Sequence, residues 1–574
     1  MAALFRASRL HSSYFSCQPS CLVFRKIDSK RESFAMDELF QQLLRSPLFE
    51  PRQRHHVNLK TYMDLTIKRM HAIFGTGLVN NDLWLGQPRQ SEFSSLCERM
   101  GNLGAFDYAL HSSIVDHMIA VDALFNHGSD AQIKRYRDEA VHLHKVYAFG
   151  CTEVAVGTDV RNVRTTVTYN RENHDLVLDS PSPEACKCWI GNAFRAAQVL
   201  MVLARLIVDG EDQGHHWFRV VIRKRENGRL LNGVKIMACD PKGGIHANQV
   251  AAIRFCQMRL PLDALLQRHA RFTDEGAFVS DLPLPQRFVS ALKTFLQERL
   301  LFMAGVRHSA GLTAHLSYRF ARHRMIHAPS GQVALLSQPL FRQRLYAVQL
   351  KALALKYLEQ AVRKRFEANW ANEAKRKELH VLAAVCKAVG AWQALEVMAR
   401  SRELCGSQGF HHYNQVVTQR MDCEVANTFA GDSSVMAYQV AKDAVARPRF
   451  VDSFPTTIGQ RVEAKIIKEC VQPTGFTHGQ ALGLVYARAL DLVIQEVENV
   501  GVLEPATLDD LVGEFADQLY PWDVRKPERA GLDVSPQQVE ALAILLKPPQ
   551  TLVSALFDCP DYIQQFTRAL YEEQ

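Results

Sequence analysis

Hydrophobic positions recur at two different spacings along the chain, and the spacing changes twice. From about residue 36 to residue 146, apolar positions follow a helical period between short polar breaks, as at 114–125. Between about 149 and 275 the apolar runs become short and β-branched, and Gly, Pro, Asn and Asp divide them, which is typical of strands. These runs lie at residues 164–169, 175–178, 199–208, 217–222, 234–238 and 250–260. The pattern predicts a helical domain followed by an all-β domain.

The helical period returns after Pro285 and persists toward the end of the chain. Residues 350–361 and 379–398 predict long amphipathic helices, and two prolines at 447–457 predict a linker. Further helices are predicted at residues 462–471, 482–497, 508–519 and 539–546. The fold class is therefore multidomain α+β. Its expected parts are a leader at 1–35, an N-terminal helical domain at 36–148, a β domain at 149–275, a helical bundle at 276–446 and a second helical domain at 447–574.

Length and composition are those of an ordinary multidomain globular protein. The chain has 574 residues, 47% of them hydrophobic and 22% charged. No apolar run is long enough to cross a bilayer, so no transmembrane segment is expected. The net charge of +8 forms no long basic stripe, which argues against a nucleic-acid partner. The 13 cysteines include no C-x-x-C pair, so neither a metal site nor a disulfide framework is expected.

The first 35 residues are basic and rich in serine, with no acidic residue before Asp28. This composition is typical of a mitochondrial presequence, but it equally fits a disordered leader with Met36 as an alternative start. The final residues are Tyr-Glu-Glu-Gln, which is not the Ser-Lys-Leu peroxisomal signal.

Five short motifs, in a shared order, resemble the acyl-CoA oxidase family. The stretch 150–159 (GCTEVAVGTD) resembles T-E-x-G-x-G-S/T, and the strand that follows it, 163–170, resembles L-E-T-T-A-T-Y-D. Residues 125–132 are similar to N-Q-G-T/S-x-x-Q, and residues 187–192 are similar to K-W-W-P-G-N. Residues 216–223 are similar to H-P-F-I-V-P-I-R, and residues 258–266 are similar to V-R-I-P-R-E-N-M-L. The resemblance covers about residues 36–574, with a second bundle shorter than is usual.

The resemblance implies an acyl-CoA dehydrogenase/oxidase-like fold that binds FAD between the β domain and the bundle. It also implies a homodimer in the peroxisome, with fatty acyl-CoA and molecular oxygen as substrates. Products would be trans-2-enoyl-CoA and hydrogen peroxide, as in fatty acid β-oxidation.

Five residues carry over as candidate cofactor ligands. The resemblance assigns Thr152 to a hydrogen bond with the isoalloxazine edge and Gly191 to a close backbone approach to that ring. In the bundle, 318–323 resembles R-Y-S-A-V-R-H, which assigns Arg322 to the pyrophosphate. Residues 405–410 resemble C-G-G-H-G-Y, so Gly406 and Gly409 would border the cofactor, although a helix C-cap explains them equally well.

The catalytic base expected from the family is missing. Its T-F-E-G-E-N motif reads Thr-Phe-Ala-Gly-Asp-Ser at 428–433, which puts Ala430 at the position of the glutamate. A buried carboxylate is needed there to take the α-proton of the thioester. The interval of 20 residues from Phe410 to Ala430 matches the family's, so no gap restores the glutamate.

Two other carboxylates are candidates for the base. Asp432 stands at the second acid of the motif, where an N-terminal helix cap is the favoured interpretation. Glu298 lies in a string similar to the Q-E-R-L-L of long-chain and isovaleryl-type acyl-CoA dehydrogenases, whose base is on this helix. Its spacing of 24 residues to Arg322 is about two residues short for that role, which favours a surface position.

Three functions remain open. The leading hypothesis is an acyl-CoA oxidase with weak or specialised activity. The alternatives are a catalytically inactive scaffold or ligand-binding protein on the same fold, and a mitochondrial acyl-CoA dehydrogenase that uses Glu298.

Overall fold

The computed structural model describes residues 38–50, 53–81, 90–224, 227–448, 455, 457–470, 476–515 and 534–548. The predicted leader at 1–35 and the last residues of the chain lie outside the described residues.

Helices form the N-terminal part of the molecule. They are α1 (Glu38–Leu44), α2 (Leu59–Gly75), α4 (Gln90–Phe106), α5 (Tyr108–His127) and α6 (Asp130–Val141). The predicted helix at 114–125 lies inside α5. This helix starts six residues earlier because the carboxylate of Asp107 accepts hydrogen bonds from the amides of Ala109 and Leu110.

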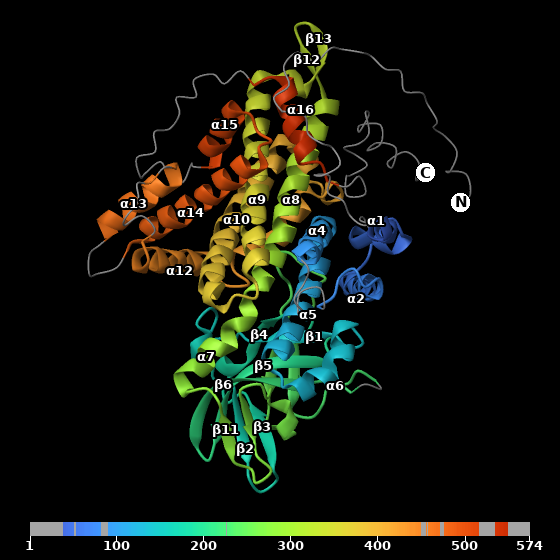
Figure 1. The fold of residues 1–574 in the computed structure, drawn as a ribbon. Helices are drawn as coiled ribbons and strands as arrows, with labels where there is room; N and C mark the ends of the chain where they lie inside the picture. Colours follow the sequence, from blue (N-terminus) through green and yellow to red (C-terminus); the bar gives the residue numbers. More distant parts are fainter. Residues whose placement is uncertain are drawn as a thin grey trace, which may run out of the picture.

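Two sheets make the β domain, which α5 and α6 border (Figure 1). The larger sheet has the order β1-β5-β2-β3-β9, with β6 also paired to β5, and the smaller one has the order β4-β8-β7. The strands are β1 (Tyr147–Gly150), β2 (Thr166–Asn170), β3 (Asp175–Asp179), β4 (Lys187–Ile190), β5 (Val199–Val208), β6 (Glu211–Val221), β7 (Val234–Ala238), β8 (Ala251–Phe255) and β9 (Met258–Leu260). A small hairpin of β10 (Ala270–Phe272) and β11 (Phe278–Ser280) follows. All six predicted runs contain strands, and the run at 199–208 is the central, almost fully buried β5.

Three long helices build the bundle and stand side by side above the β domain (Figure 1). They are α8 (Gln297–His323), α9 (Pro339–Asn369) and α10 (Arg376–Leu404). Short α7 (Leu284–Ala291) packs on β6 of the β domain and leads into the bundle. The hairpin of β12 (Met325–Ala328) and β13 (Gly331–Ala334) caps the far end of the bundle. After α10 the chain returns toward the β domain through α11 (Val416–Cys423) and turns into α12 (Ser433–Ala446).

The last helices cover the outer side of the bundle rather than forming a separate body. They are α13 (Ile458–Cys470), α14 (His478–Val500), α15 (Pro505–Phe515) and α16 (Pro536–Leu545). Helix α14 packs on α9, α10 and α12, and one hydrophobic core runs from the N-terminal helices to this layer. The predicted capping box of Ser535 and Gln538 begins α16.

One described stretch, Glu373–Leu404, is long and apolar enough to cross a membrane. The rest of the protein buries 78% of the most apolar part of this stretch. Such burial is typical of a core helix in a bundle.

Candidate active site

Glu298 lies in the first turn of α8, and its carboxylate is buried without a partner. The residue is 2% exposed, and in the described part of the chain no group makes a hydrogen bond or ion pair with it. Removal from water raises the pKa of Glu298 to about 8, against the opposing charge of Arg299. The predicted surface position of Glu298 is therefore wrong. It was inferred from spacing alone, which does not reveal that the start of α8 meets the β domain.

The loop that carries Ala430 lies beside Glu298 and is held by two cations. Arg299 donates a hydrogen bond from Nε to the carbonyl oxygen of Ala430 at 3.2 Å. Lys387 on α10 is also buried, and its ammonium donates to the carbonyl oxygens of Asn427 and Gly431 and to the hydroxyl of Ser433. Burial lowers the pKa of Lys387 to about 7. The loop thus approaches the start of α8 as the family motif requires, but it brings a methyl group in place of a carboxylate.

Asp432 has the structural role that the sequence favours. Its carboxylate accepts hydrogen bonds from the amides of Ser434, at 2.8 Å, and Val435, and so caps the N-terminus of α12. An acceptor used in this way is not available as a base at Ala430, two residues earlier.

The β domain contributes the opposite side of this region. The hydroxyl of Thr152 donates to the carbonyl oxygen of Cys188 at 2.6 Å and thereby links the start of the 152–165 loop to β4. At the end of β4, Trp189 has a left-handed φ of 61° and is 66% exposed. The exposed indole, one residue after Cys188, offers a planar ring a surface for stacking.

Gly191 has no Cβ atom, so another group can approach its backbone closely. In this structure that group is the side chain of Asp116 on α5. A Cβ atom at Gly191 would lie 1.9 Å from Oδ2 of Asp116. The same Oδ2 accepts a hydrogen bond from Asn248 at 2.7 Å, and burial raises the pKa of Asp116 to about 7.

Electrostatic contacts join the two sides into one site. Burial is the main reason why the pKa values of Glu298 and Cys151 are raised, and the charge of Asp116 adds to the first shift as the charge of Glu298 adds to the second. Cys151 directly precedes Thr152. Thr152, Gly191, Glu298 and Ala430 therefore surround one junction of α5, α8 and the β domain.

Arg322 does not belong to this junction. It lies 24 residues after Glu298 on the same continuous helix, about 36 Å along the helix axis. There its exposed guanidinium faces Glu540 at 3.9 Å. Within one chain, α8 therefore holds Arg322 far from Thr152 and Gly191, and a role of all three in binding one cofactor stays a prediction.

Gly406 and Gly409 lie toward the same end of the bundle as Arg322. The adjacent Cys405 thiol contacts the Ser317 hydroxyl of α8 at 3.5 Å. A Cβ atom at Gly409 would lie 2.3 Å from the carbonyl oxygen of Arg402, and Gly406 has a left-handed φ of 55°. The tight turn that ends α10 is sufficient reason for both glycines.

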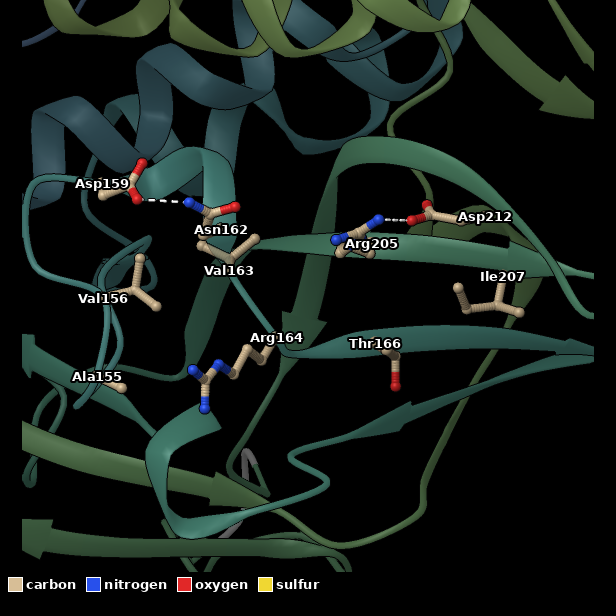
Figure 2. Close-up of a pocket in the computed structure, with 10 residues that line it drawn as sticks. All are labelled: Ala155, Val156, Asp159, Asn162, Val163, Arg164, Thr166, Arg205, Ile207 and Asp212. Atoms are coloured by element: carbon tan, nitrogen blue, oxygen red, sulfur yellow. Dashed lines mark hydrogen bonds and ion pairs between the residues drawn. The ribbon is translucent and has the colours of Figure 1, made fainter.

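A cavity of about 660 Å³ lies on the β domain and contains none of the predicted site residues (Figure 2). The loop at 155–166 and strands β5 and β6 line it. Its charges are mixed, since Arg164 and Arg205 are accompanied by Asp159 and Asp212, and Arg205 pairs with Asp212.

Two family models match the chain in the regions that build the junction. The acyl-CoA dehydrogenase middle domain matches residues 148–258, and the acyl-CoA oxidase C-alpha1 domain matches residues 293–445. The chain therefore contains a region that matches the C-alpha1 domain of acyl-CoA oxidases, and it is similar to that family over both regions.

Relatives and solved structures agree with this family. A putative peroxisomal acyl-coenzyme A oxidase 3.2 of Arabidopsis thaliana is 26% identical over 71% of this chain and 62% of its own length. The human peroxisomal acyl-coenzyme A oxidase 3 is 24% identical over 75% of this chain and 66% of its own length. The chain therefore spans about two thirds or less of these relatives. An acyl-CoA oxidase 1 structure from Yarrowia lipolytica superposes with a TM-score of 0.76, at 17% identity, over 94% of this chain and 91% of the other, which confirms the predicted fold class.

Three residues of the junction were missed by sequence reasoning. Of the three, Lys387 was the easiest to predict from the sequence, because it is a lone cation among apolar residues of a predicted helix. Trp189 lies in a motif that was recognised but not interpreted. Asp116 gives no signal, because its position opposite Gly191 depends on how α5 packs on the β domain.

Proposed function

We propose that this protein is an FAD-dependent acyl-CoA oxidase in which Glu298 replaces the missing base. It oxidises acyl-CoA to trans-2-enoyl-CoA and reduces molecular oxygen to hydrogen peroxide, as a step of fatty acid β-oxidation. The observation that carries the proposal is the buried, unpartnered carboxylate of Glu298 beside the loop where Ala430 replaces the expected glutamate.

Glu298 has the properties of a base for the α-proton of a thioester. A carboxylate whose pKa is raised to about 8 by burial accepts a proton far more readily than an exposed one. Among the described residues, no hydrogen bond stabilises its ionised form. The cations of Arg299 and Lys387 favour the ionised form before the reaction, and Asp116 disfavours it. When bound, FAD supplies the acceptor for the hydride that leaves the β-carbon.

Three residues of the β domain fit the ring system of a flavin. The exposed indole of Trp189 offers a stacking face, the Thr152 hydroxyl can also accept a hydrogen bond, and Gly191 adds no side chain at this edge. An acyl-CoA oxidase 2 structure of Caenorhabditis elegans is described as bound with FAD, ascaroside-CoA and ATP, and it superposes with a TM-score of 0.72 at 17% identity. That likeness supports the same ligand classes here.

The pyrophosphate of FAD requires a second copy of the chain. Arg322 lies about 36 Å along α8 from the junction, so it cannot serve the flavin ring site of its own chain. In a homodimer, the partner's far end of α8 would supply this guanidinium, together with the turn at Gly406 and Gly409. The proposed site is therefore shared between two protomers.

The peroxisome is the proposed compartment, since several relatives are named as peroxisomal oxidases. The same names favour an oxidase over the inactive scaffold and over the mitochondrial dehydrogenase.

Spectroscopy tests the proposed function. Purified protein supplied with FAD should be yellow, acyl-CoA should bleach the flavin band without air, and readmitted air should restore the band and release peroxide. Yellow protein that no acyl-CoA bleaches would favour the inactive scaffold. Bleaching that air does not reverse, without peroxide, would select the dehydrogenase.

A further inference from the structure

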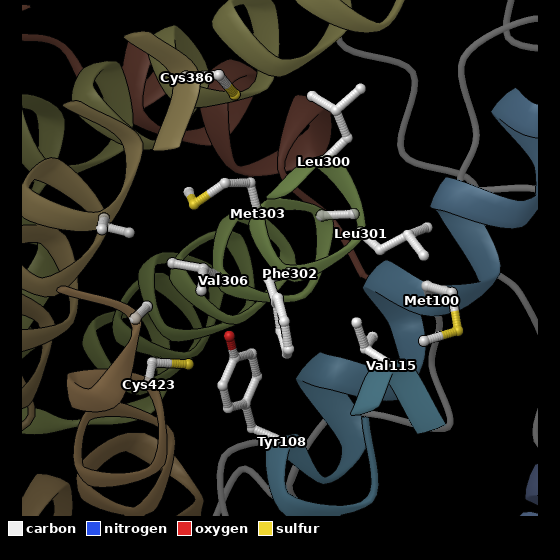
Figure 3. Close-up of a cluster of buried hydrophobic side chains, with 14 of the residues drawn as sticks. Met100, Tyr108, Val115, Leu300, Leu301, Phe302, Met303, Val306, Cys386 and Cys423 are labelled. Atoms are coloured by element: carbon white, nitrogen blue, oxygen red, sulfur yellow. The ribbon is translucent and has the colours of Figure 1, made fainter. Parts of the chain in front are cut away.

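The face of α8 that carries Glu298 is closed by an aromatic side chain one turn further on. Phe302 lies four residues after Glu298, so the two side chains share one helix face with an offset of about 6 Å along the axis. Phe302 is buried and takes part in the apolar interior between α4, α5 and α8 (Figure 3).

Four rings from three segments form one wall at this point, which we call the aromatic wall. It consists of Tyr108, His111, Phe302 and Phe429. The ring of Phe302 lies 4.1 Å from that of Phe429, which directly precedes Ala430. His111 lies 6.0 Å from Phe302, and Tyr108 lies 6.5 Å from Phe429, measured between ring centroids. The wall therefore connects α5, α8 and the loop of the missing base.

Backbones pack directly against each other behind the aromatic wall. A Cβ atom at Gly305 would lie 2.8 Å from the ring of His111 and 3.0 Å from that of Tyr108. A Cβ atom at Gly104 of α4 would lie 2.5 Å from the Cα of Gly305. A hydrogen bond of 3.1 Å between the His111 ring and the carbonyl oxygen of Leu301 also ties α5 to α8. Since interiors are packed this closely, additional methylene groups could enter only by displacing these elements.

We propose that the aromatic wall restricts the substrate to short acyl groups, with Phe302 as the residue that determines specificity. This inference rests on the proposed function, because it takes Glu298 as the group that faces the α-carbon. The offset of about 6 Å along the helix axis between Glu298 and Phe302 is the length of roughly four carbon–carbon bonds, so the inference limits the substrate to acyl chains of about four to six carbons. A longer chain meets the rings of Phe302 and Phe429.

Chain-length profiles of binding and turnover test the inference. Binding of butanoyl-, hexanoyl-, dodecanoyl- and hexadecanoyl-CoA is measured by calorimetry on Glu298→Gln holoprotein, which should turn them over only slowly. Flavin bleaching is measured on the wild type. We expect hexanoyl-CoA to bind on the order of 10²-fold more tightly than hexadecanoyl-CoA. The ratio of the affinity for dodecanoyl-CoA to that for hexanoyl-CoA should be at least tenfold higher when Phe302→Val is added.

Phe366→Val is the matched control. Phe366 is an equally buried phenylalanine of α9 that packs on Phe93 and Trp370, away from the aromatic wall. It should lose stability without changing the chain-length profile. Equal or tighter binding of hexadecanoyl-CoA by the Glu298→Gln holoprotein, or an unchanged profile in Phe302→Val, would overturn the inference. Length-dependent binding without bleaching would instead leave the inference standing and reject the proposed oxidase.

Discussion

Arg299 donates a hydrogen bond from Nε to the carbonyl oxygen of Ala430, 131 positions later in the chain. This contact fixes the loop of the missing base against the first turn of α8, directly beside Glu298. Under the proposed function, Glu298 on this helix takes the role of the carboxylate that the loop lacks at Ala430. The contact also explains why the fold can keep the junction although the family's base is absent.

The pH dependence of turnover should report the ionisation of Glu298. A base must be ionised to accept a proton, and burial raises the pKa of Glu298 to about 8. We therefore expect kcat/KM to rise with pH up to about 8 and to level off above it. Stopped-flow bleaching between pH 6 and pH 9.5 measures this profile. A plateau that already begins near pH 5 would contradict the assignment.

Stability should depend on pH through the same group. Below pH 4.5, Glu298 is protonated in both the folded and the unfolded chain, whereas between 4.5 and 8 only the unfolded chain ionises it. The wild type therefore loses stability as pH rises through this window, and uncharged Glu298→Gln does not. We therefore expect the difference in Tm, variant minus wild type, to be a few degrees larger at pH 8.5 than at pH 4.5. The same difference at both values would show that Glu298 is not buried as described.

Moving the carboxylate back to the loop should restore activity. In a Glu298→Gln background, Ala430→Glu places an acid at the position that the family motif uses, and we expect turnover to recover at least tenfold. Thr428→Glu is the control, because this residue is exposed on the same loop. Recovery in both variants, or in neither, would count against the geometry proposed for the junction.

Lys387 should stabilise the loop more than an exposed lysine stabilises its surroundings. Lys387→Met removes the donor for two backbone carbonyl groups and the Ser433 hydroxyl. We expect the free energy of unfolding to fall by about 1–3 kcal/mol. Lys375→Met removes an exposed ion pair with Glu378 and should change the free energy of unfolding far less. Denaturant titration of both variants measures the difference, and equal losses would mean that Lys387 does not hold the loop.

A shared flavin site should allow complementation between two defective chains. Thr152→Val and Arg322→Ala should each weaken FAD binding in a homodimer. A mixed dimer contains one site with both residues intact and one site with neither. Tight binding should therefore return at one of the two sites of each mixed dimer, which is about a quarter of all sites when the two chains pair at random. Fluorescence titration with FAD measures the recovery. Mixtures that bind FAD as weakly as the separate variants would exclude the shared site.

Periodicity was sufficient to predict most of the fold, because long helices and the buried β5 carry strong patterns. Strands β1 and β4 were not predicted as strands, since four residues carry too little periodicity to be recognised, and β4 was found only as a motif. Within the site, the motif revealed the alanine at 430. It could not reveal the burial of Glu298 or the distance to Arg322, because both follow from how a 27-residue helix meets the β domain. The closeness of Gly191 to Asp116 likewise depends on packing between distant segments.

The most direct test of the central claim is the rate at which butanoyl-CoA bleaches the flavin of Glu298→Gln in a single anaerobic turnover. The account predicts that this variant keeps its flavin and its fold but is bleached about 10²–10⁴ times more slowly than the wild type. Bleaching at the wild-type rate would show that another group takes the proton and that Glu298 is not the base.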